Sequence, residues 1–146
     1  METASTRTPL QCVVVTPERA VLDETCDFVA LPMYDGELGV LPGRRPLIGR
    51  LGFGELRTVR GPTVRRFYVD GGFVQVRANV VTVLTGKAVR AEDIKAPTVE
   101  QSLRQPVAAA TTEEALEANL KNQERLRAQL RVARHAGEGG GHGTGH

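Results

Sequence analysis

The residues that could bind a nucleotide phosphate stand at the wrong spacings for it. Gly86-Lys87 would complete a phosphate-binding loop only if a glycine stood five positions before Gly86, where the chain has Val81. Gly49, Gly52 and Gly54 lack both the G-x-G-x-x-G spacing and a following helical pattern, so we interpret them as turn and bulge glycines. The sequence therefore predicts neither a phosphate-binding loop nor a dinucleotide site.

Acid–base and metal chemistry also lack their usual residues. The three histidines, His135, His142 and His146, fall at or beyond the end of an expected long helix, which leaves no imidazole elsewhere for a triad or a metal site. Adjacent acids such as Glu92-Asp93 and Glu113-Glu114 fall on segments expected to be exposed, where nothing would separate their pKa values. We therefore expect no catalytic residue, metal or cofactor, and a function that depends on what the surfaces bind.

The cysteines, the net charge and the apolar runs indicate which partners and which cellular location to expect. Cys12 and Cys26 lack C-x-x-C spacing, so we interpret both as buried small hydrophobes, with a disulfide between them as the alternative. The 146 residues carry 19 basic and 17 acidic side chains, a net charge of +2 that does not favour nucleic acid as a partner. No apolar run approaches the roughly 20 residues that span a bilayer, and residues 1–9 lack the pattern of a secretory signal, so we expect a cytoplasmic protein.

The first part of the chain has the composition of short antiparallel strands. Runs rich in Val, Ile, Phe, Tyr and Thr alternate with Gly, Pro, Asp and Asn. The clearest predicted strands are 10–15, 28–31, 54–59, 64–69, 72–76 and 80–84. Because Gly and Asn tolerate positive φ, hairpin turns are expected at 60–62, 70–72 and 78–79. One apolar face on each strand predicts an antiparallel β-sandwich or flattened barrel over residues 10–95.

Helix-forming residues replace the strand pattern after residue 95, which predicts a helical domain over 96–136. A short helix is expected over 98–105, with Thr98 as its N-cap and Pro106 ending it. A long helix is expected from Thr111 or Thr112 to about His135. Residues 1–9 are expected to be flexible, and the Gly-rich residues 137–146 disordered.

The long predicted helix is amphipathic and has its charges in a helical order. Acids stand in its first half and arginines in its second, as the helix macrodipole favours. Its apolar residues fall within one arc and predict a stripe that packs on another surface. This stripe consists of Leu116, Leu120, Leu126 and Leu130.

Three sequence stretches, in order along the chain, resemble the epsilon subunit of bacterial F-type ATP synthases. They are GELGVLPGRRPLIGRLGFGELR (36–57), FYVDGGFVQV (67–76) and NVVTVLTGKAVRAEDI (79–94). The likeness resumes at AQLRVA (128–133). The resemblance implies a β-sandwich followed by a helical segment, and a non-catalytic central-stalk subunit. Such a subunit links the gamma subunit to the membrane c-ring and couples ion flow to ATP synthesis, peripherally, at the cytoplasmic face of the bacterial membrane.

The resemblance also implies where the c-ring would be contacted. In the family, the loop with the Gly-Glu-Leu-Gly and Leu-Pro-Gly-His motifs faces the c-ring. Glu37 matches the loop acid, whereas Arg44 stands where the family usually has His and Arg45 where it usually has Ala. Two guanidinium groups would suit an acidic or carbonyl-rich c-loop. The alternative is that both arginines simply point to solvent.

The expected gamma-subunit contact is a largely apolar face of the sandwich with a polar rim. Ordinary core or turn structure is the alternative for each candidate residue. The candidates are Leu41, Pro42, Leu47, Phe73 and Val74.

Many members of the family have a C-terminal helix pair that either folds onto the sandwich or extends and blocks ATP hydrolysis. In an extended state a basic row on the long helix would reach acidic segments of the catalytic alpha and beta subunits; this row is Arg125, Arg127, Arg131 and Arg134. A permanently docked helix with a solvated basic face is the alternative. The family's ATP-binding Ile-Asp-x-x-Arg-Ala motif is not kept, because Lys95 replaces the Asp and Thr98 the Arg.

Three functions therefore stay open from the sequence. The first is a rotor subunit, and the second is mainly a regulatory inhibitor of ATP hydrolysis. The third, an unrelated β-sandwich module for a small ligand, is disfavoured by the absence of Trp and the small number of other aromatic residues.

Overall fold

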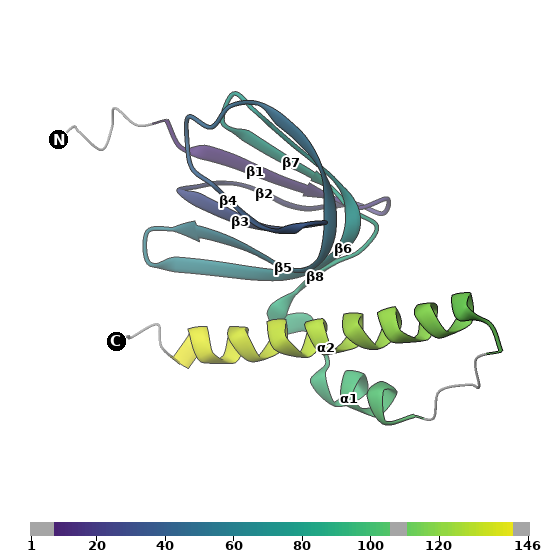
Figure 1. Cartoon of the computed structure of the whole chain (residues 1–146). Helices are drawn as coiled ribbons and strands as arrows, with labels where there is room; N and C mark the ends of the chain where they lie inside the picture. Colours follow the sequence, from purple (N-terminus) through teal and green to yellow (C-terminus); the bar gives the residue numbers. More distant parts are fainter. Residues whose placement is uncertain (1–7, 106–110, 142–146) are drawn as a thin grey trace.

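The computed structural model describes residues 8–105 and 111–141, the last five of them as backbone alone. Eight strands lie in this part of the chain, followed by a 3-10 turn and two helices (Figure 1). The strands are β1 (Leu10–Val15), β2 (Ala20–Cys26), β3 (Phe28–Met33), β4 (Gly36–Val40), β5 (Leu47–Arg60), β6 (Thr63–Arg77), β7 (Val80–Leu84) and β8 (Ala88–Arg90). The helical elements are η2 (Ala91–Asp93), α1 (Ala96–Arg104) and α2 (Glu113–Gly141). The predicted fold class, a β-sandwich followed by a short and a long helix, is confirmed.

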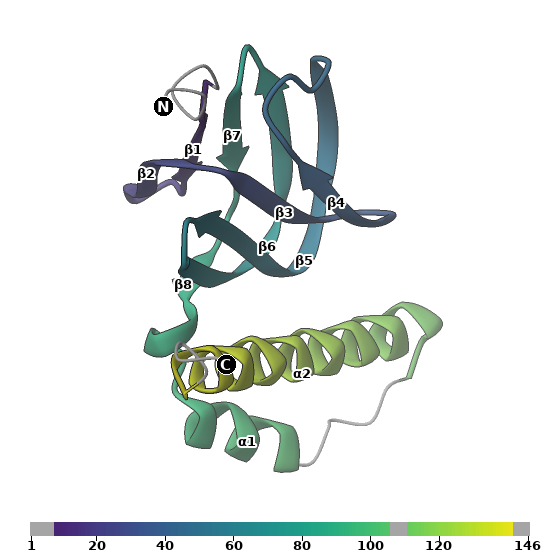
Figure 2. The ribbon, with the colours of Figure 1, turned by 90° about the vertical axis from the view of Figure 1, so that its left-hand side faces the viewer.

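The strands are hydrogen-bonded in the order β2-β1-β7-β6-β5-β3-β4, with β8 pairing to β6. One pair departs from the predicted antiparallel pattern, since β1 and β7 run parallel. The two strands are far apart in sequence, so no hairpin constrains their direction. Figure 2 shows the strands wrapping around a common interior, with α1 and α2 lying beneath one end.

Two long strands carry most of the sheet, and the predicted hairpin at 70–72 is wrong. β6 continues through Gly71 and Gly72, whose φ angles are +76° and +116°, and pairs with β5 along its whole length. At these glycines the alternation of inward-facing side chains shifts by one residue. Odd-numbered residues, Phe67 and Val69, point into the core before the glycines, and even-numbered ones, Val74 and Val76, point into it after them. The glycines therefore make a corner within one strand rather than a reversal of the chain.

The remaining turn predictions hold, and three strands were missed. Gly61 has a φ of +57° between β5 and β6, and Ala78 and Asn79 have φ angles of +50° and +64° between β6 and β7. The missed strands are β2, which contains Asp and Glu, β4, which contains two glycines, and β8, which has three residues. Acids in β2, glycines in β4 and the short length of β8 weaken the local signal for a strand, and pairing with neighbours stabilises these strands instead.

The interior of the β domain is filled by aliphatic side chains from seven strands. Leu10, Val14, Leu31, Leu56 and Val83 are each fully buried there. Cys12 and Cys26 lie in the same core, 1% and 3% exposed and not joined by a disulfide, which confirms their interpretation as buried hydrophobes. Burial raises the pKa of both thiols, so they stay protonated.

The start of α1 and the end of α2 differ from the predictions, whereas the start of α2 agrees. α1 begins at Ala96 with Lys95 as its N-cap, not Thr98, because Pro97 fits the first turn, where its missing N–H is not needed. The predicted cap of α2 is confirmed: the Thr112 hydroxyl accepts a hydrogen bond from the Ala115 N–H at 3.0 Å. The predicted end near His135 is wrong, since α2 continues to Gly141.

Glycines lower helix propensity by about 1 kcal/mol each, but they leave helical hydrogen bonding possible at the end of a long helix. This explains why α2 extends into the Gly-rich segment that we expected to be disordered. The expectations for residues 1–7 and 142–146 lie outside the described residues.

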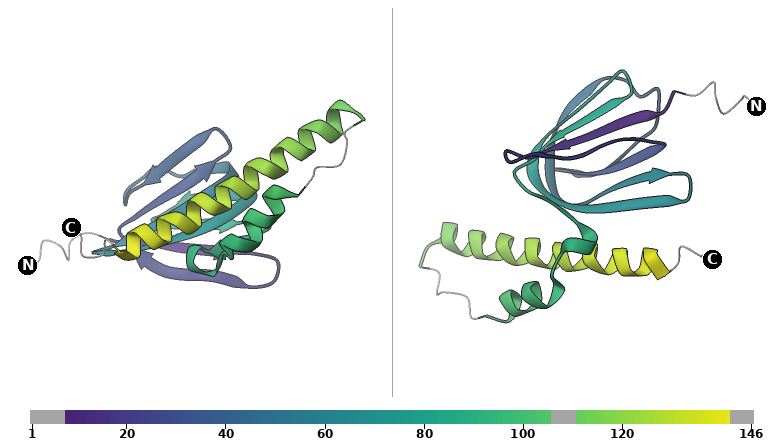
Figure 3. Two further views of the ribbon diagram at one scale, coloured as in Figure 1. Left: turned by 90° about the horizontal axis from the view of Figure 1, so that it is seen from below. Right: turned by 180° about the vertical axis from the view of Figure 1, so that it is seen from behind.

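The leucine stripe of α2 packs only in its second half. Leu116 and Leu120 are 51% and 55% exposed, whereas Leu130 is 8% exposed. The closest packing comes from Ala128 and Val132, which join Tyr68 and Ala91 in a small second core beneath the sheet. Figure 3 shows the reason: α2 crosses obliquely below the strands, and its first half extends past them.

Candidate interaction surfaces

The loop end of the molecule consists of the β4–β5 loop (41–46) and the β6–β7 turn (78–79), and it lies away from both helices (Figure 2). The Asn79 side chain joins the two, because its Oδ1 accepts a hydrogen bond from the Gly43 N–H at 2.8 Å. Asn79 is in the left-handed region, which this residue type tolerates. Its turn therefore positions the loop that carries Arg44 and Arg45.

Glu37 and Arg44, which the family resemblance assigned to one contact, line the same cavity. This loop cavity has a volume of about 580 Å³ and is also lined by Tyr34, Asp35 and Arg50. The Glu37 side chain is 60% exposed and lies 3.8 Å from the Arg57 guanidinium, a surface pair of little strength. Two carboxylates and two guanidiniums thus stand around a depression whose other lining residues include Met33, Leu38 and Leu47.

Arg45 lies apart from Glu37, in a smaller cavity of about 350 Å³ on the neighbouring side of the loop. Arg44 lines both cavities, and Leu41 and Pro42 line the smaller one with it. Arg44 and Arg45 are both exposed. The loop therefore presents two cations on a short, anchored segment.

An apolar patch lies on the outer face of the sheet. Phe73 on β6 stands directly opposite Leu84 on β7 and Arg50 on β5. Phe73 is 58% and Leu84 53% exposed, and Ile48, one row further along β5, is 77% exposed. The Arg50 guanidinium covers the Tyr34 ring at 4.7 Å and so continues the surface to the β3–β4 turn. We call Tyr34, Ile48, Phe73 and Leu84 the outer-face patch.

The structure separates the residues expected at the gamma contact. Phe73 and Leu41 are well exposed, and Pro42 is half-buried. Val74 is fully buried, so its side chain does not belong to a surface. Leu47 is partly buried against the core and also lines the loop cavity. Side chains alternate between faces along a strand, so Phe73 and Val74 cannot both point outward. Strict use of that alternation would have excluded Val74 once Phe73 was assigned to the outer face.

A third surface is already occupied, because α2 docks on the outer face beyond the glycine corner. Arg125 pairs with Asp70 at 3.0 Å and lies over the Phe53 ring at 5.2 Å. The Tyr68 hydroxyl donates to Asp70 Oδ2 at 3.1 Å. Burial and the Asp70 charge raise the pKa of Tyr68, so this donor stays protonated.

A second polar contact holds the C-terminal part of α2. The Glu55 carboxylate lies 2.5 Å from Nδ1 of His135 and 3.4 Å from the guanidiniums of Arg57 and Arg66. Arg66 also donates to the His135 carbonyl oxygen at 3.5 Å. We call the Asp70–Arg125 and Glu55–His135 contacts together the helix clasp.

The basic row of α2 is divided by this docking. Arg125 is engaged by the sheet, whereas Arg127, Arg131 and Arg134 are exposed. Arg127 donates a hydrogen bond to Oε1 of Gln123 on its own helix, at 3.3 Å. Three of the four arginines thus remain accessible while the helix is docked.

The Asp70–Arg125 pair is expected to contribute measurably to docking. Asp70→Asn and Arg125→Ala should each lower the free energy of unfolding, and the double variant should show a coupling energy of about 1 kcal/mol, as partly buried pairs do. Urea unfolding of the four proteins measures this coupling. Arg127→Ala is the matched control and should change stability little. Strict additivity of the Asp70 and Arg125 effects would contradict the contact.

Membrane and metal features were also sought in the described part of the chain. Neither α1 nor α2, over residues 8–105 and 111–141, is long and apolar enough to cross a membrane. The side chains described there form no group of three or more His, Cys, Asp or Glu residues that could hold a metal ion.

Comparisons with known proteins agree on one family. The model of the ATP synthase delta/epsilon chain beta-sandwich domain matches residues 9–91. An ATP synthase epsilon chain of Rhodopirellula baltica is 49% identical over 131 residues, which cover 86% of this chain and 98% of that one. The epsilon chain of Herpetosiphon aurantiacus is 34% identical over 126 residues, which cover 86% and 88% of the two chains.

Two solved structures share the fold. A chain of the Tetrahymena thermophila mitochondrial ATP synthase central stalk and c-ring superposes with a TM-score of 0.69 at 15% identity, covering 87% of this chain and 98% of that one. A chain of the Euglena gracilis mitochondrial ATP synthase, in a structure of OSCP, F1 and c-ring, superposes with a TM-score of 0.66 at 19% identity, covering 86% of this chain and 78% of that one. The sandwich match and the epsilon-chain relatives, which extend through the helices, show that this chain belongs to the family of ATP synthase epsilon chains.

Proposed function

We propose that this chain is the epsilon subunit of an F-type ATP synthase, a non-catalytic part of the central stalk that turns with the rotor and couples ion flow to ATP synthesis. The observation that carries the proposal is the 49% identity to an epsilon chain over 98% of that chain's length. It includes both the sandwich and the helices, so the whole architecture is shared rather than one module.

The loop end is the surface that we assign to the c-ring. Arg44 and Arg45 project from the loop that Asn79 anchors, and Glu37, on β4, lines a cavity together with Arg44. Guanidinium groups have a fixed fork of donors and a charge that does not titrate near neutral pH. They suit the carbonyl and carboxylate groups of a polar c-ring loop.

The outer-face patch is the surface that we assign to the gamma subunit. Stable interfaces have an apolar core with a polar rim, and here Phe73, Leu84 and Ile48 are bordered by Arg50 and Gln75. Large apolar side chains of this exposure, side by side on one sheet face, are typical of interaction sites. Leu41 and Pro42 would extend the contact toward the loop end.

Inhibition of ATP hydrolysis by the C-terminal helix is a second candidate function, favoured by the polar nature of the helix clasp. Salt screens ion pairs and partners can replace them, so a helix held partly by Asp70 and Glu55 can leave the sheet at moderate cost. The exposed Arg127, Arg131 and Arg134 would then meet acidic segments of the alpha and beta subunits. Both functions place the chain peripherally, at the cytoplasmic face of the bacterial membrane.

Charge reversal at the loop end tests the c-ring assignment. Arg44→Glu should weaken association of a gamma–epsilon complex with detergent-solubilised c-ring about tenfold, which corresponds to ~1.4 kcal/mol. Arg127→Glu, the same change at an exposed site on α2, is the control and should bind normally. Equal binding by Arg44→Glu and the natural chain would remove Arg44 from the contact.

A further inference from the structure

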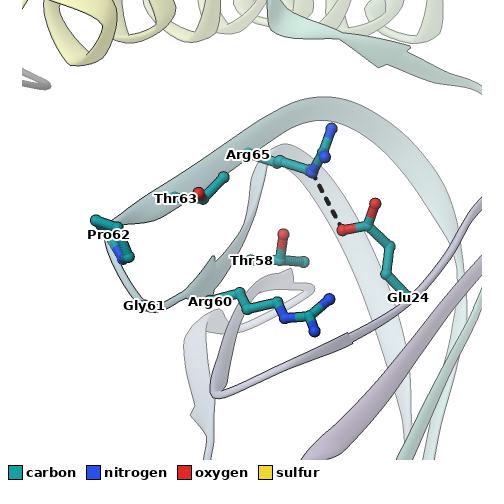
Figure 4. Close-up of a pocket in the computed structure, with 7 residues that line it drawn as sticks. All are labelled: Glu24, Thr58, Arg60, Gly61, Pro62, Thr63 and Arg65. Carbon is teal, nitrogen blue, oxygen red and sulfur yellow. Dashed lines mark ion pairs between the residues drawn. The ribbon is translucent and has the colours of Figure 1, made fainter.

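A polar pocket lies at the tip of the β5–β6 hairpin, where the inner face of the two strands leaves the apolar core. Leu56 and Phe67 are the last apolar pair on this face. The next two cross-strand pairs toward the tip are Thr58 with Arg65 and Arg60 with Thr63. With Glu24 of β2 they surround a cavity of about 480 Å³ (Figure 4). No lining residue is shared with the loop cavity.

The Thr58 hydroxyl is a buried polar group that has no partner among the described residues. Thr58 is only 4% exposed, and within the described residues its hydroxyl makes no hydrogen bond. Figure 4 shows the hydroxyl pointing into the pocket, toward the space between the two arginines. Burying a hydroxyl unpaired costs about 1–3 kcal/mol, so such groups in natural proteins usually receive a partner. A ligand in the pocket would supply it.

The two arginines bring net positive charge to the same space. Arg60 forms no ion pair with any residue that the structure describes, while Nε of Arg65 lies 3.1 Å from Oε1 of Glu24. The Glu24 contact uses one edge of the Arg65 guanidinium. The side chains that line the cavity carry a formal charge of +1, from two guanidiniums and one carboxylate, and they include the Thr63 hydroxyl. The Asp27 carboxylate is not among them but lies behind the turn, at the Gly61 N–H.

The hairpin tip is held in place before any ligand arrives. The Asp27 carboxylate accepts a hydrogen bond from the Gly61 N–H at 2.8 Å, and the Val59 carbonyl accepts one from the Asp27 N–H at 2.7 Å. These contacts fix the strand ends that carry Thr58 and Arg60. The backbone of the site therefore needs no ordering when an anion binds, which lowers the entropic cost of binding.

We propose that this pocket binds a phosphate group, either as free phosphate or as the monoester of a small molecule. The tetrahedral oxyanion would accept hydrogen bonds from the Thr58 hydroxyl and from the guanidiniums of Arg60 and Arg65, the residue type suited to phosphate. Glu24 holds Arg65 in position at the rim. The inference does not depend on the stalk role, because it uses none of the surfaces assigned to gamma or the c-ring.

Phosphate titration of the full-length chain, followed by ¹H–¹⁵N NMR at constant ionic strength, tests the site. Inorganic phosphate should produce saturable shifts at Thr58, Gly61 and Arg65. Arg60→Gln should weaken binding at least tenfold. Thr58→Val, which replaces the hydroxyl by a methyl group of similar size, should weaken binding at least fivefold without loss of thermal stability. The matched control Arg77→Gln, at the other end of β6, should bind phosphate as the natural chain does.

Two further titrations, with adenosine monophosphate and with acetate, identify which kind of anion the pocket binds. Tighter binding of adenosine monophosphate than of phosphate would assign an esterified phosphate, and equal or weaker binding would assign the free ion. Acetate binding as well as phosphate would overturn the proposal in favour of a carboxylate partner. Non-saturable shifts at all exposed arginines, or unchanged affinity in both Arg60→Gln and Thr58→Val, would also overturn it.

Discussion

Phe73→Asp is expected to weaken binding of this chain to its gamma subunit at least 100-fold while the β domain stays folded. Phe73 is 58% exposed at the centre of the outer-face patch, between Arg50 and Leu84. Central aromatic residues dominate interface energies, commonly at about 2 kcal/mol or more each. An aspartate there would also lose its hydration in the complex, which adds a desolvation cost. Isothermal titration calorimetry with the isolated gamma subunit measures the loss.

A matched control separates this effect from a general change in surface charge. Leu116→Asp replaces another large exposed apolar residue, on the part of α2 that extends past the sheet. It should leave gamma binding unchanged. If Phe73→Asp binds as tightly as Leu116→Asp, the outer-face patch is not the gamma contact.

Gly72→Ala is expected to lower the free energy of unfolding by at least about 3 kcal/mol, enough to unfold many small domains. Gly72 has a φ of +116°, and a Cβ atom built there would lie 1.9 Å from the Leu84 carbonyl oxygen. That oxygen is backbone of the neighbouring strand, so relief requires β6 and β7 to separate at the glycine corner. Urea unfolding measures the change.

Gly61→Ala provides the comparison for Gly72→Ala. Gly61 also has a positive φ, +57°, but a Cβ atom there would meet nothing within 4 Å. Its substitution should cost only the left-handed backbone strain, about 1–2 kcal/mol. Similar losses for the two variants would show that the close approach of Leu84 does not limit position 72.

Local signals in the sequence were sufficient for much of the fold. Asn79 and Gly61 identified their turns because tolerance of a positive φ angle depends on the residue type alone. Thr112 identified a helix start because its hydroxyl accepts a hydrogen bond from a backbone N–H only three residues later. Gly71-Gly72 misled for the same reason: positive φ suits a hairpin and a corner equally. What distinguishes them is the continued pairing of β6 with β5, which is not local.

At the candidate surfaces, too, some residues were predictable from the sequence and others were not. The joint position of Glu37 and Arg44 followed from a family motif, and the structure places both at one cavity. The contacts of Arg125 with Asp70 and of His135 with Glu55 join residues 55 and 80 positions apart, so no spacing rule could predict them. Val74 was misplaced because apolar composition was used without the two-residue alternation of a strand.

Binding to gamma tests the central claim, membership of the rotor stalk, most directly. Full-length chain and the gamma subunit of the same organism should be co-expressed and passed through size-exclusion chromatography with multi-angle light scattering. The account predicts a stable one-to-one complex that also retains the c-ring when it is added. Elution of the two chains as separate species, each correctly folded, would contradict the claim that this chain is a central-stalk subunit.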